Sequence, residues 1–249
     1  MSSHAKEPDC GGRVASWSFD GVTAAQQKKF KDAFCRQIEA VEHWVAKQNL
    51  PGPHKIPPLK ISISPDFPLA MSLVPAWNGD WGVMQFPATR VAAGQVNMVH
   101  ELIHVYLPNG NRMLAEGLAS FVQDEIGSNP AFPNFGKDVD KMVRCDMKPQ
   151  DLRHVSLAHL DQIRTPDLLT VGGASKNDSL AGYVVASSFV RYLIETDGMD
   201  KFRKLYGRTP FEPGRRVGRT SDDWTAIYGH SIGDIEKKWK AKIEALTCP

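Results

Sequence analysis

The chain has 249 residues, of which 42% are hydrophobic and 23% charged, and its formal net charge at pH 7 is +2. This length and apolar content can bury one sizeable core, so we expect a single domain, or one domain in two lobes around a cleft. Charges of both signs are interspersed and no apolar run is long enough to span a bilayer, so we expect neither a nucleic-acid partner nor a membrane span.

The N-terminal part is predicted to combine one long helix with short strands. Apolar residues recur at helical spacing from Thr23 to about Gln48, and Thr23 suits the N-cap, which predicts an amphipathic helix. After a proline-rich connector, residues 59–64 alternate apolar and polar side chains, which is typical of a half-buried strand. Further short strands are expected near residues 70–74 and 82–86.

The next helix is expected to begin around Ala92 or Ala93, and it carries His100, Glu101 and His104 in the pattern His-Glu-x-x-His. Histidines four residues apart lie on one face of a helix, so both rings can reach one metal ion. Neutral imidazoles are good zinc ligands, and a carboxylate beside them can accept a proton from a bound water. The alternative is an ordinary helix, but its two histidines and Glu101 would then need other partners in apolar surroundings.

A second helix is expected to start near Asn111, because residues 107–110, Leu-Pro-Asn-Gly, end the first one. This second helix places Glu116 among small and apolar residues, where a carboxylate needs a partner. An ordinary solvent-facing carboxylate is the alternative. We predict one Zn²⁺ ion held by His100, His104 and Glu116.

The sequences HELIH, residues 100–104, and AEGLASF, residues 115–121, together resemble the gluzincin zinc metallopeptidases of the thermolysin and aminopeptidase type. They are most similar to small peptidase MA-like domains with an EGLA glutamate helix. The resemblance covers roughly residues 59–246. It implies an α+β, zincin-like fold with a small sheet and the active-site helix in an N-terminal lobe, about 20–108. The C-terminal lobe, about 109–249, is expected to be mostly helical.

Details of the motif narrow the subtype. The metzincin pattern fits poorly, because Leu107 and Gly110 stand where it requires Gly and then His or Asp. The resemblance implies an edge strand that pairs with an extended substrate, and residues 80–86 are the candidate. This stretch loosely resembles the Gly-x-Met-Glu-Asn motif of gluzincin aminopeptidases. Gln85 and Phe86 replace its Glu and Asn, which favours an endopeptidase; a plain sheet strand is the alternative.

The C-terminal half is predicted to be mostly helical. Residues 129–136 form a loop with two aromatic side chains, which either rims the cleft or covers the core. Helical patches are expected around residues 137–144 and 150–160. A strong helix is expected from about residue 179 to 195, ending near Gly198, a natural C-cap residue.

The resemblance also implies roles for the site residues. Glu101 is expected to act as general base and then general acid. Gluzincins usually stabilise the oxyanion with a Tyr or His of the C-terminal lobe, and Tyr183 is the first candidate and His230 the second. A core aromatic is the alternative for Tyr183. Ser120 either orients a zinc ligand or is an ordinary helix serine.

The four cysteines, Cys10, Cys35, Cys145 and Cys248, form no Cys-x-x-Cys pair, which argues against a second zinc site. Their even number is compatible with two disulfides, in any of three pairings. Two disulfides would favour a secreted or periplasmic protein. Residues 1–12 are polar and lack the apolar core of a signal peptide, so we expect this to be the mature chain without its signal peptide. A cytoplasmic protein with four reduced thiols is the alternative.

Taken together, the sequence predicts a zinc-dependent metallopeptidase, an endopeptidase acting on a peptide or protein substrate. A catalytically silent zincin-fold binding protein and a zinc hydrolase of a non-peptide amide are the alternatives. The presence of Glu101 favours an enzyme, because a binding module has no chemical need for a general base beside the metal. The substrate's identity and the oligomeric state are left open.

Overall fold

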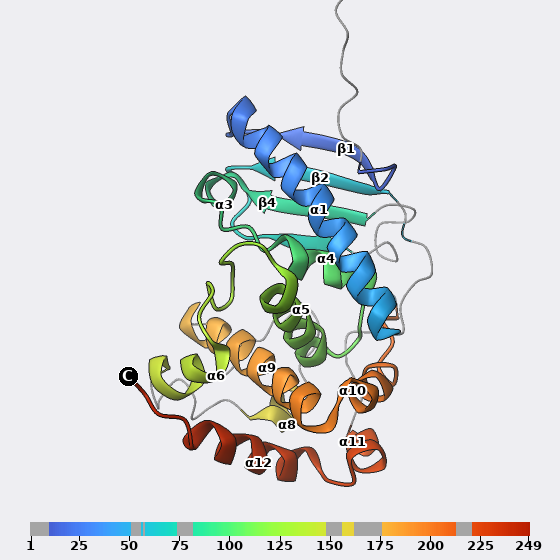
Figure 1. The fold of residues 1–249 in the computed structure, drawn as a ribbon, viewed down its shortest axis with the longest axis vertical. Helices are drawn as coiled ribbons and strands as arrows, with labels where there is room; N and C mark the ends of the chain where they lie inside the picture. The colour runs from blue at the N-terminus through green and yellow to red at the C-terminus, as the bar shows by residue number, and fades with distance from the viewer. Residues whose placement is uncertain are drawn as a thin grey trace, which may run out of the picture.

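The structure is a computed structural model that describes residues 10–50, 56, 58–73, 82–147, 156–161, 176–212 and 221–249. A small sheet lies at one end of the molecule and a group of helices at the other, with helices α4 (Met98–Tyr106) and α5 (Arg112–Ile126) between them (Figure 1). This mixed α/β content agrees with the α+β expectation. The zincin-like fold and the lobe boundary near residue 108 stay predictions.

Four strands form the sheet in the order β1-β2-β4-β3. Strands β1 (Val14–Phe19), β2 (Leu59–Ser64) and β4 (Gly82–Pro87) are parallel, and β3 (Met71–Leu73) is antiparallel to β4. The predictions of strands at 59–64, 70–74 and 82–86 are confirmed for the residues that the structure describes, whereas β1 was not predicted.

The prediction that residues 80–86 form an edge strand is wrong for its described part, residues 82–86; residues 80 and 81 lie outside the described chain. Strand β4 pairs with β2 on one side and β3 on the other, so its backbone is already used. Its buried side chains, among them Met84 and Phe86, belong to the core. The edge strand on this side of the sheet is β3, which packs against α4.

Helix α1 (Ala24–Gln48) covers one face of the sheet (Figure 1). It begins at Thr23, whose side chain and that of Gln26 form a reciprocal capping box, as the sequence predicted. Phe30 and Phe34 are buried and meet Phe86 of β4 at ring-centroid distances of 5.5 and 6.2 Å. This aromatic cluster fixes α1 on the sheet, and α1 in turn packs on α4.

The prediction of one helix starting at Ala92 or Ala93 is wrong. A short helix, α3 (Ala88–Ala93), ends at Gly94, whose φ of +67° is a left-handed conformation that suits glycine. Helix α4 then starts separately at Met98. It is buried along most of its length, because α1 lies on one side and α5 on the other.

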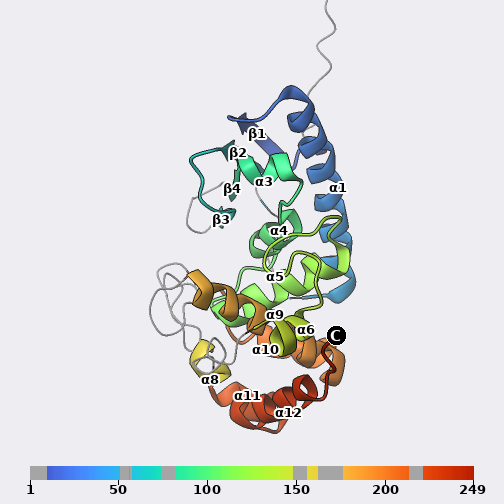
Figure 2. The ribbon, with the colours of Figure 1, turned by 90° about the vertical axis from the view of Figure 1, so that its left-hand side faces the viewer.

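Helix α5 begins at the N-cap Asn111, whose side chain accepts a hydrogen bond from the Leu114 amide at 3.0 Å. It packs closely on helix α9 (Lys176–Asp197) (Figure 2). A Cβ on Gly117 would lie 2.4 Å from the Val190 side chain and 2.5 Å from the Ala186 carbonyl oxygen. The small residue beside Glu116 therefore permits this close helix contact.

The other described elements are short or peripheral: α6 (Val139–Lys141), the π-helical turn η1 (Met142–Asp146), α8 (Leu157–Leu160), α10 (Met199–Tyr206), α11 (Ser221–Tyr228) and α12 (Ile232–Glu244). The predicted helical patch at 137–144 is confirmed. Within 150–160, residues 157–160 are helical, and 150–155 lie outside the described chain. The predicted helix at 179–195 is part of α9, which is followed by Gly198 with a φ of +87°.

Two disulfides join Cys10 to Cys35 and Cys145 to Cys248, which confirms the expectation of two bridges and selects one of the three pairings. Such bridges are typical of extracellular or otherwise oxidising compartments. No helix among the described residues is both long and apolar enough to cross a membrane.

Candidate metal centre

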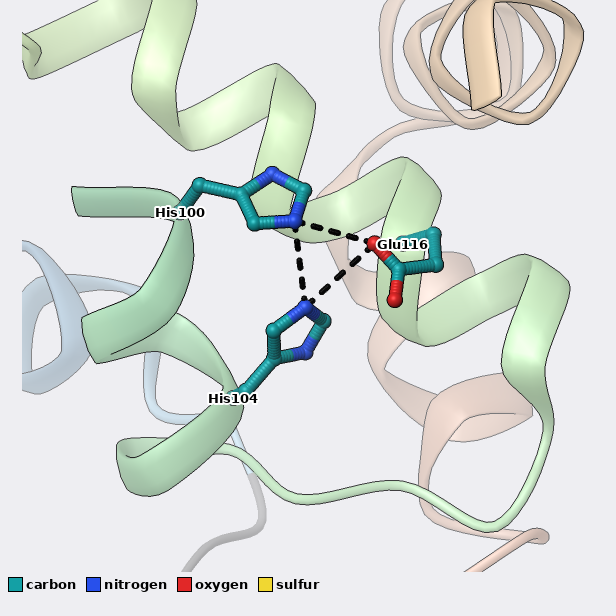
Figure 3. Close-up of side chains that lie close together, drawn as sticks. All are labelled: His100, His104 and Glu116. Carbon is teal, nitrogen blue, oxygen red and sulfur yellow. Dashed lines mark hydrogen bonds and ion pairs between the residues drawn. The ribbon is translucent and has the colours of Figure 1, made fainter. Parts of the chain in front are cut away.

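Three predicted ligands meet between α4 and α5, where the side chains of His100, His104 and Glu116 point toward one another (Figure 3). The Nε2 atoms of the two histidines are 3.2 Å apart. Glu116 Oε2 lies 2.9 Å from His100 Nε2 and 3.4 Å from His104 Nε2. Helical spacing brings the histidines together, and the turn after α4 returns the chain so that α5 supplies the carboxylate.

The donor atoms fit a metal ion. Four ligands at zinc's usual bond lengths of about 2.0–2.1 Å would stand about 3.4 Å apart at the corners of a tetrahedron. The three observed separations come close to that value. Both Glu116 oxygens are buried without a hydrogen-bond partner among the described residues, although they lie in ion-pair contacts. A buried carboxylate with unused acceptor capacity beside two ring nitrogens suits a cation with nitrogen and oxygen preference.

Glu116 is 1% exposed, and its charge is compensated from two sides. Burial alone would raise the pKa of this carboxyl, but the Arg112 guanidinium and the two histidines hold its pKa well below the usual range. Arg112 Nη2 is 2.5 Å from Oε1, whereas the histidines contact Oε2. These contacts favour the ionised carboxylate, which is the form that binds a metal.

Glu101 lies beside the cluster but is not part of the ligand set. It is 4% exposed and accepts a hydrogen bond from Asn97 Nδ2 at 2.9 Å. Burial raises the pKa of its carboxyl, while the charge of His100 and a hydrogen bond with the Ser72 side chain oppose that rise. A buried carboxylate with a raised pKa is a stronger proton acceptor than one in water.

Tyr183, the first oxyanion candidate, is brought to the same region by α9. Its hydroxyl accepts a hydrogen bond from Arg112 Nη2 at 3.3 Å, and its pKa is raised mainly by burial and then by the charge of Glu116. The loop aromatic Phe132 packs edge-on against the Tyr183 ring at 5.0 Å. Part of the loop at 129–136 therefore borders this tyrosine, while Phe135 is 36% exposed.

His230, the second oxyanion candidate, is not brought to the cluster. It is exposed in the turn between α11 and α12, at the end of the molecule opposite the sheet and well separated from α4 (Figure 1). Ser120 does lie near a ligand, since its Oγ is 3.4 Å from His100 Nδ1. This contact is compatible with orienting the imidazole so that Nε2 faces the cluster.

Two residues of the site were not found from the sequence, Asn97 and Arg112. Asn97 holds the N-cap position of α4, but its side chain makes no capping bond and binds Glu101 instead. Arg112 contacts Glu116 and Tyr183. Each stands four residues before the carboxylate it contacts, so the helical spacing that identified the histidines could also have indicated both.

Comparison with known proteins gave no match to a protein-family model, a curated protein or a solved structure. The resemblance to gluzincins thus rests on the sequence itself, and mainly on residues 100–104 and 115–121.

Proposed function

We propose that this protein is a zinc-dependent metallopeptidase, and specifically an endopeptidase. One observation carries the proposal: a buried His-His-Glu cluster has a second buried carboxylate, Glu101, beside it that is not itself part of the donor set. A purely structural metal site is usually closed by four protein ligands and has no use for an adjacent base.

The proposed ligands are His100, His104 and Glu116, which leave one position of a tetrahedral site open. When bound, zinc would supply Lewis acidity toward the scissile carbonyl and the attacking water. The protein supplies the remaining chemistry through residues that already surround the cluster.

Glu101 is proposed to accept a proton from the attacking water and to return a proton to the leaving amine nitrogen. Asn97 and Ser72 hold its carboxylate in place. The Tyr183 hydroxyl is proposed to donate a hydrogen bond to the developing oxyanion. Because it accepts from Arg112, its own proton can point elsewhere.

A peptide substrate is supported by the position of β3. This strand is at the edge of the sheet, packs against α4, and contributes Ser72 to the surroundings of Glu101. An extended peptide can add to such an edge through main-chain hydrogen bonds, which brings a backbone carbonyl close to the cluster. The exposed Leu69 and Met71 lie in and beside this strand and can contact substrate side chains.

We further propose that the protein acts in a secreted or periplasmic setting. The two disulfides support an oxidising compartment. In such a compartment, the proposed substrates would be unfolded or extended protein chains outside the cytoplasm.

The test separates metal binding from turnover. Glu101→Gln should retain zinc but lower the rate of cleavage of a denatured-protein substrate by at least about 100-fold, because a general base contributes on this scale. His104→Ala should lose both zinc and cleavage. Metal content by elemental analysis and cleavage with and without a chelator give the two readouts. A Glu101→Gln variant with undiminished hydrolysis would refute the general-base role.

A further inference from the structure

We propose that Arg112 is a positioning residue that divides the two oxygens of Glu116 between separate tasks. This inference rests on the proposed metal site. Arg112 binds Oε1, so that Oε2 alone is presented to the metal together with the two histidines. The same guanidinium links this ligand to Tyr183, so one side chain fixes two parts of the site.

The contacts of Glu116 are asymmetric. Oε1 lies 2.5 Å from Arg112 Nη2, whereas Oε2 faces both histidine rings. Arg112 is the first residue of α5 and stands one helical turn before Glu116, so the helix itself sets the reach of its side chain. The Glu116 carboxylate is 1% exposed, whereas the Arg112 side chain is 21% exposed.

The guanidinium also reaches beyond Glu116. Its Nη2 atom donates to the Tyr183 hydroxyl at 3.3 Å. Tyr183 belongs to α9 and Glu116 to α5, so the Arg112 side chain connects two helices across the site. A planar guanidinium holds two acceptors in fixed directions, which the flexible ammonium of lysine does not.

Loss of Arg112 would leave the Glu116 carboxylate buried and free to rotate. Both oxygens could then turn toward the metal, which would change the number and direction of its donor atoms. The carboxylate would also lose the charge that compensates its burial. We therefore expect weaker metal binding and an altered coordination geometry, rather than a loss of fold alone.

A second Arg–Glu pair provides a matched control. Arg191 and Glu195 have the same i,i+4 spacing, on α9, with Nε 2.8 Å from Oε1. Their side chains are 31% and 43% exposed. Glu195 also contacts Lys242, and Arg191 also contacts Asp138; neither of these residues belongs to the candidate metal centre. Arg191→Met thus removes an exposed arginine with the same i,i+4 spacing to a glutamate, together with its Asp138 contact, without touching the centre.

The experiment uses Co²⁺ as a probe, because its visible absorption reports coordination geometry. The full-length protein and its Arg112→Met, Arg112→Lys and Arg191→Met variants are stripped of metal and titrated with Co²⁺ and, in competition with a chromophoric chelator, with Zn²⁺. Arg112→Met should bind both ions about 10- to 100-fold more weakly, as expected when a residue that orients a ligand is removed. Its Co²⁺ spectrum should change in shape. Arg112→Lys should recover part of the affinity, and Arg191→Met should match the unmodified protein.

The outcomes distinguish this inference from the proposed function. If the unmodified protein binds neither ion, the metal site itself is refuted, and the positioning role falls with it. If the unmodified protein binds one equivalent and Arg112→Met has the same affinity and spectrum, only the role of Arg112 is refuted. Should Arg112→Met fail to fold, as judged by circular dichroism, an Arg112→Lys variant with unchanged affinity and spectrum would overturn the proposal.

Discussion

Two carboxylates, Glu42 and Glu116, flank helix α4, and each is paired with an arginine. Glu42 of α1 accepts two hydrogen bonds from Arg13, both at 2.7 Å, and one from the Tyr106 hydroxyl at 2.9 Å. Its side chain is 35% exposed. Glu116 of α5 is 1% exposed, and neither of its oxygens has a hydrogen-bond partner in the part of the chain that the structure describes.

The difference separates a structural carboxylate from one that fits a ligand role. Glu42 is hydrogen-bonded to Arg13 and to Tyr106, the last residue of α4. These bonds link α1 to α4 and give Glu42 a structural role. Glu116 is almost fully buried, and Arg112 and the two histidines compensate its charge, but its oxygens retain acceptor capacity. Burying a charge is costly unless it is paired, and under the proposed function a cation between Glu116 and the two histidines would add to the pairing that Arg112 supplies.

The largest expected effect is on metal binding. Glu116→Gln should weaken Zn²⁺ binding by more than about 100-fold, since losing a ligand costs more than losing a residue that orients one. Glu42→Gln should leave the affinity within about twofold, because independent sites do not couple. Competition with a chromophoric chelator measures both. Equal Zn²⁺ affinities of the two variants would contradict the assignment of Glu116, and not Glu42, as a metal ligand.

A smaller effect is expected on stability. Glu42→Gln should lower the free energy of unfolding of the metal-free protein by about 1 kcal/mol. Hydrogen bonds to a charged group are usually worth more, but partial exposure of the pair screens them. Urea unfolding followed by circular dichroism checks this value. No loss of stability in Glu42→Gln would mean that the Arg13–Glu42–Tyr106 contacts do not hold α1 to α4.

The smallest expected effect is the pH dependence of the difference in unfolding free energy between the unmodified protein and Glu42→Gln. The hydrogen bonds from Arg13, together with that from Tyr106, lower the pKa of Glu42 below its ordinary 4.5, against the effect of burial. Its contribution is therefore fully present above pH 4.5 and is lost as the pH falls toward the lower folded-state pKa. The stability gap between the unmodified protein and Glu42→Gln should be unchanged at about pH 6 and should shrink as the pH falls below 4.5. A gap that stays constant on acidification would contradict this origin.

Local patterns in the sequence predicted the ligand-bearing elements well. The i,i+4 spacing places His100 and His104 on one face, and the break after α4 follows from its Pro-Asn-Gly sequence. The approach of Glu116 to them was predicted from its apolar setting, and the structure brings all three together. These patterns involve residues close together in the sequence, so they could be recognised without a structure.

Long-range pairing was not predictable in the same way. Strand β1 pairs with β2 although a 25-residue helix separates them in the sequence. Strand β4 is internal because β3 pairs with it and forms the edge of the sheet. The order of strands in a sheet depends on contacts between segments that are distant in the sequence, and local patterns do not encode these contacts. The contact of Asn97 with Glu101 is local, and it was missed because an N-cap residue normally bonds to its own helix backbone.

The most direct test of the central claim is the zinc stoichiometry of the stripped protein, measured by titration calorimetry beside the Glu116→Gln variant. The buried His-His-Glu cluster predicts one tightly bound Zn²⁺ per chain and no comparable binding by Glu116→Gln. Failure of the unmodified chain to bind Zn²⁺, or equal binding by both proteins, would contradict the assignment of His100, His104 and Glu116 as the metal ligands.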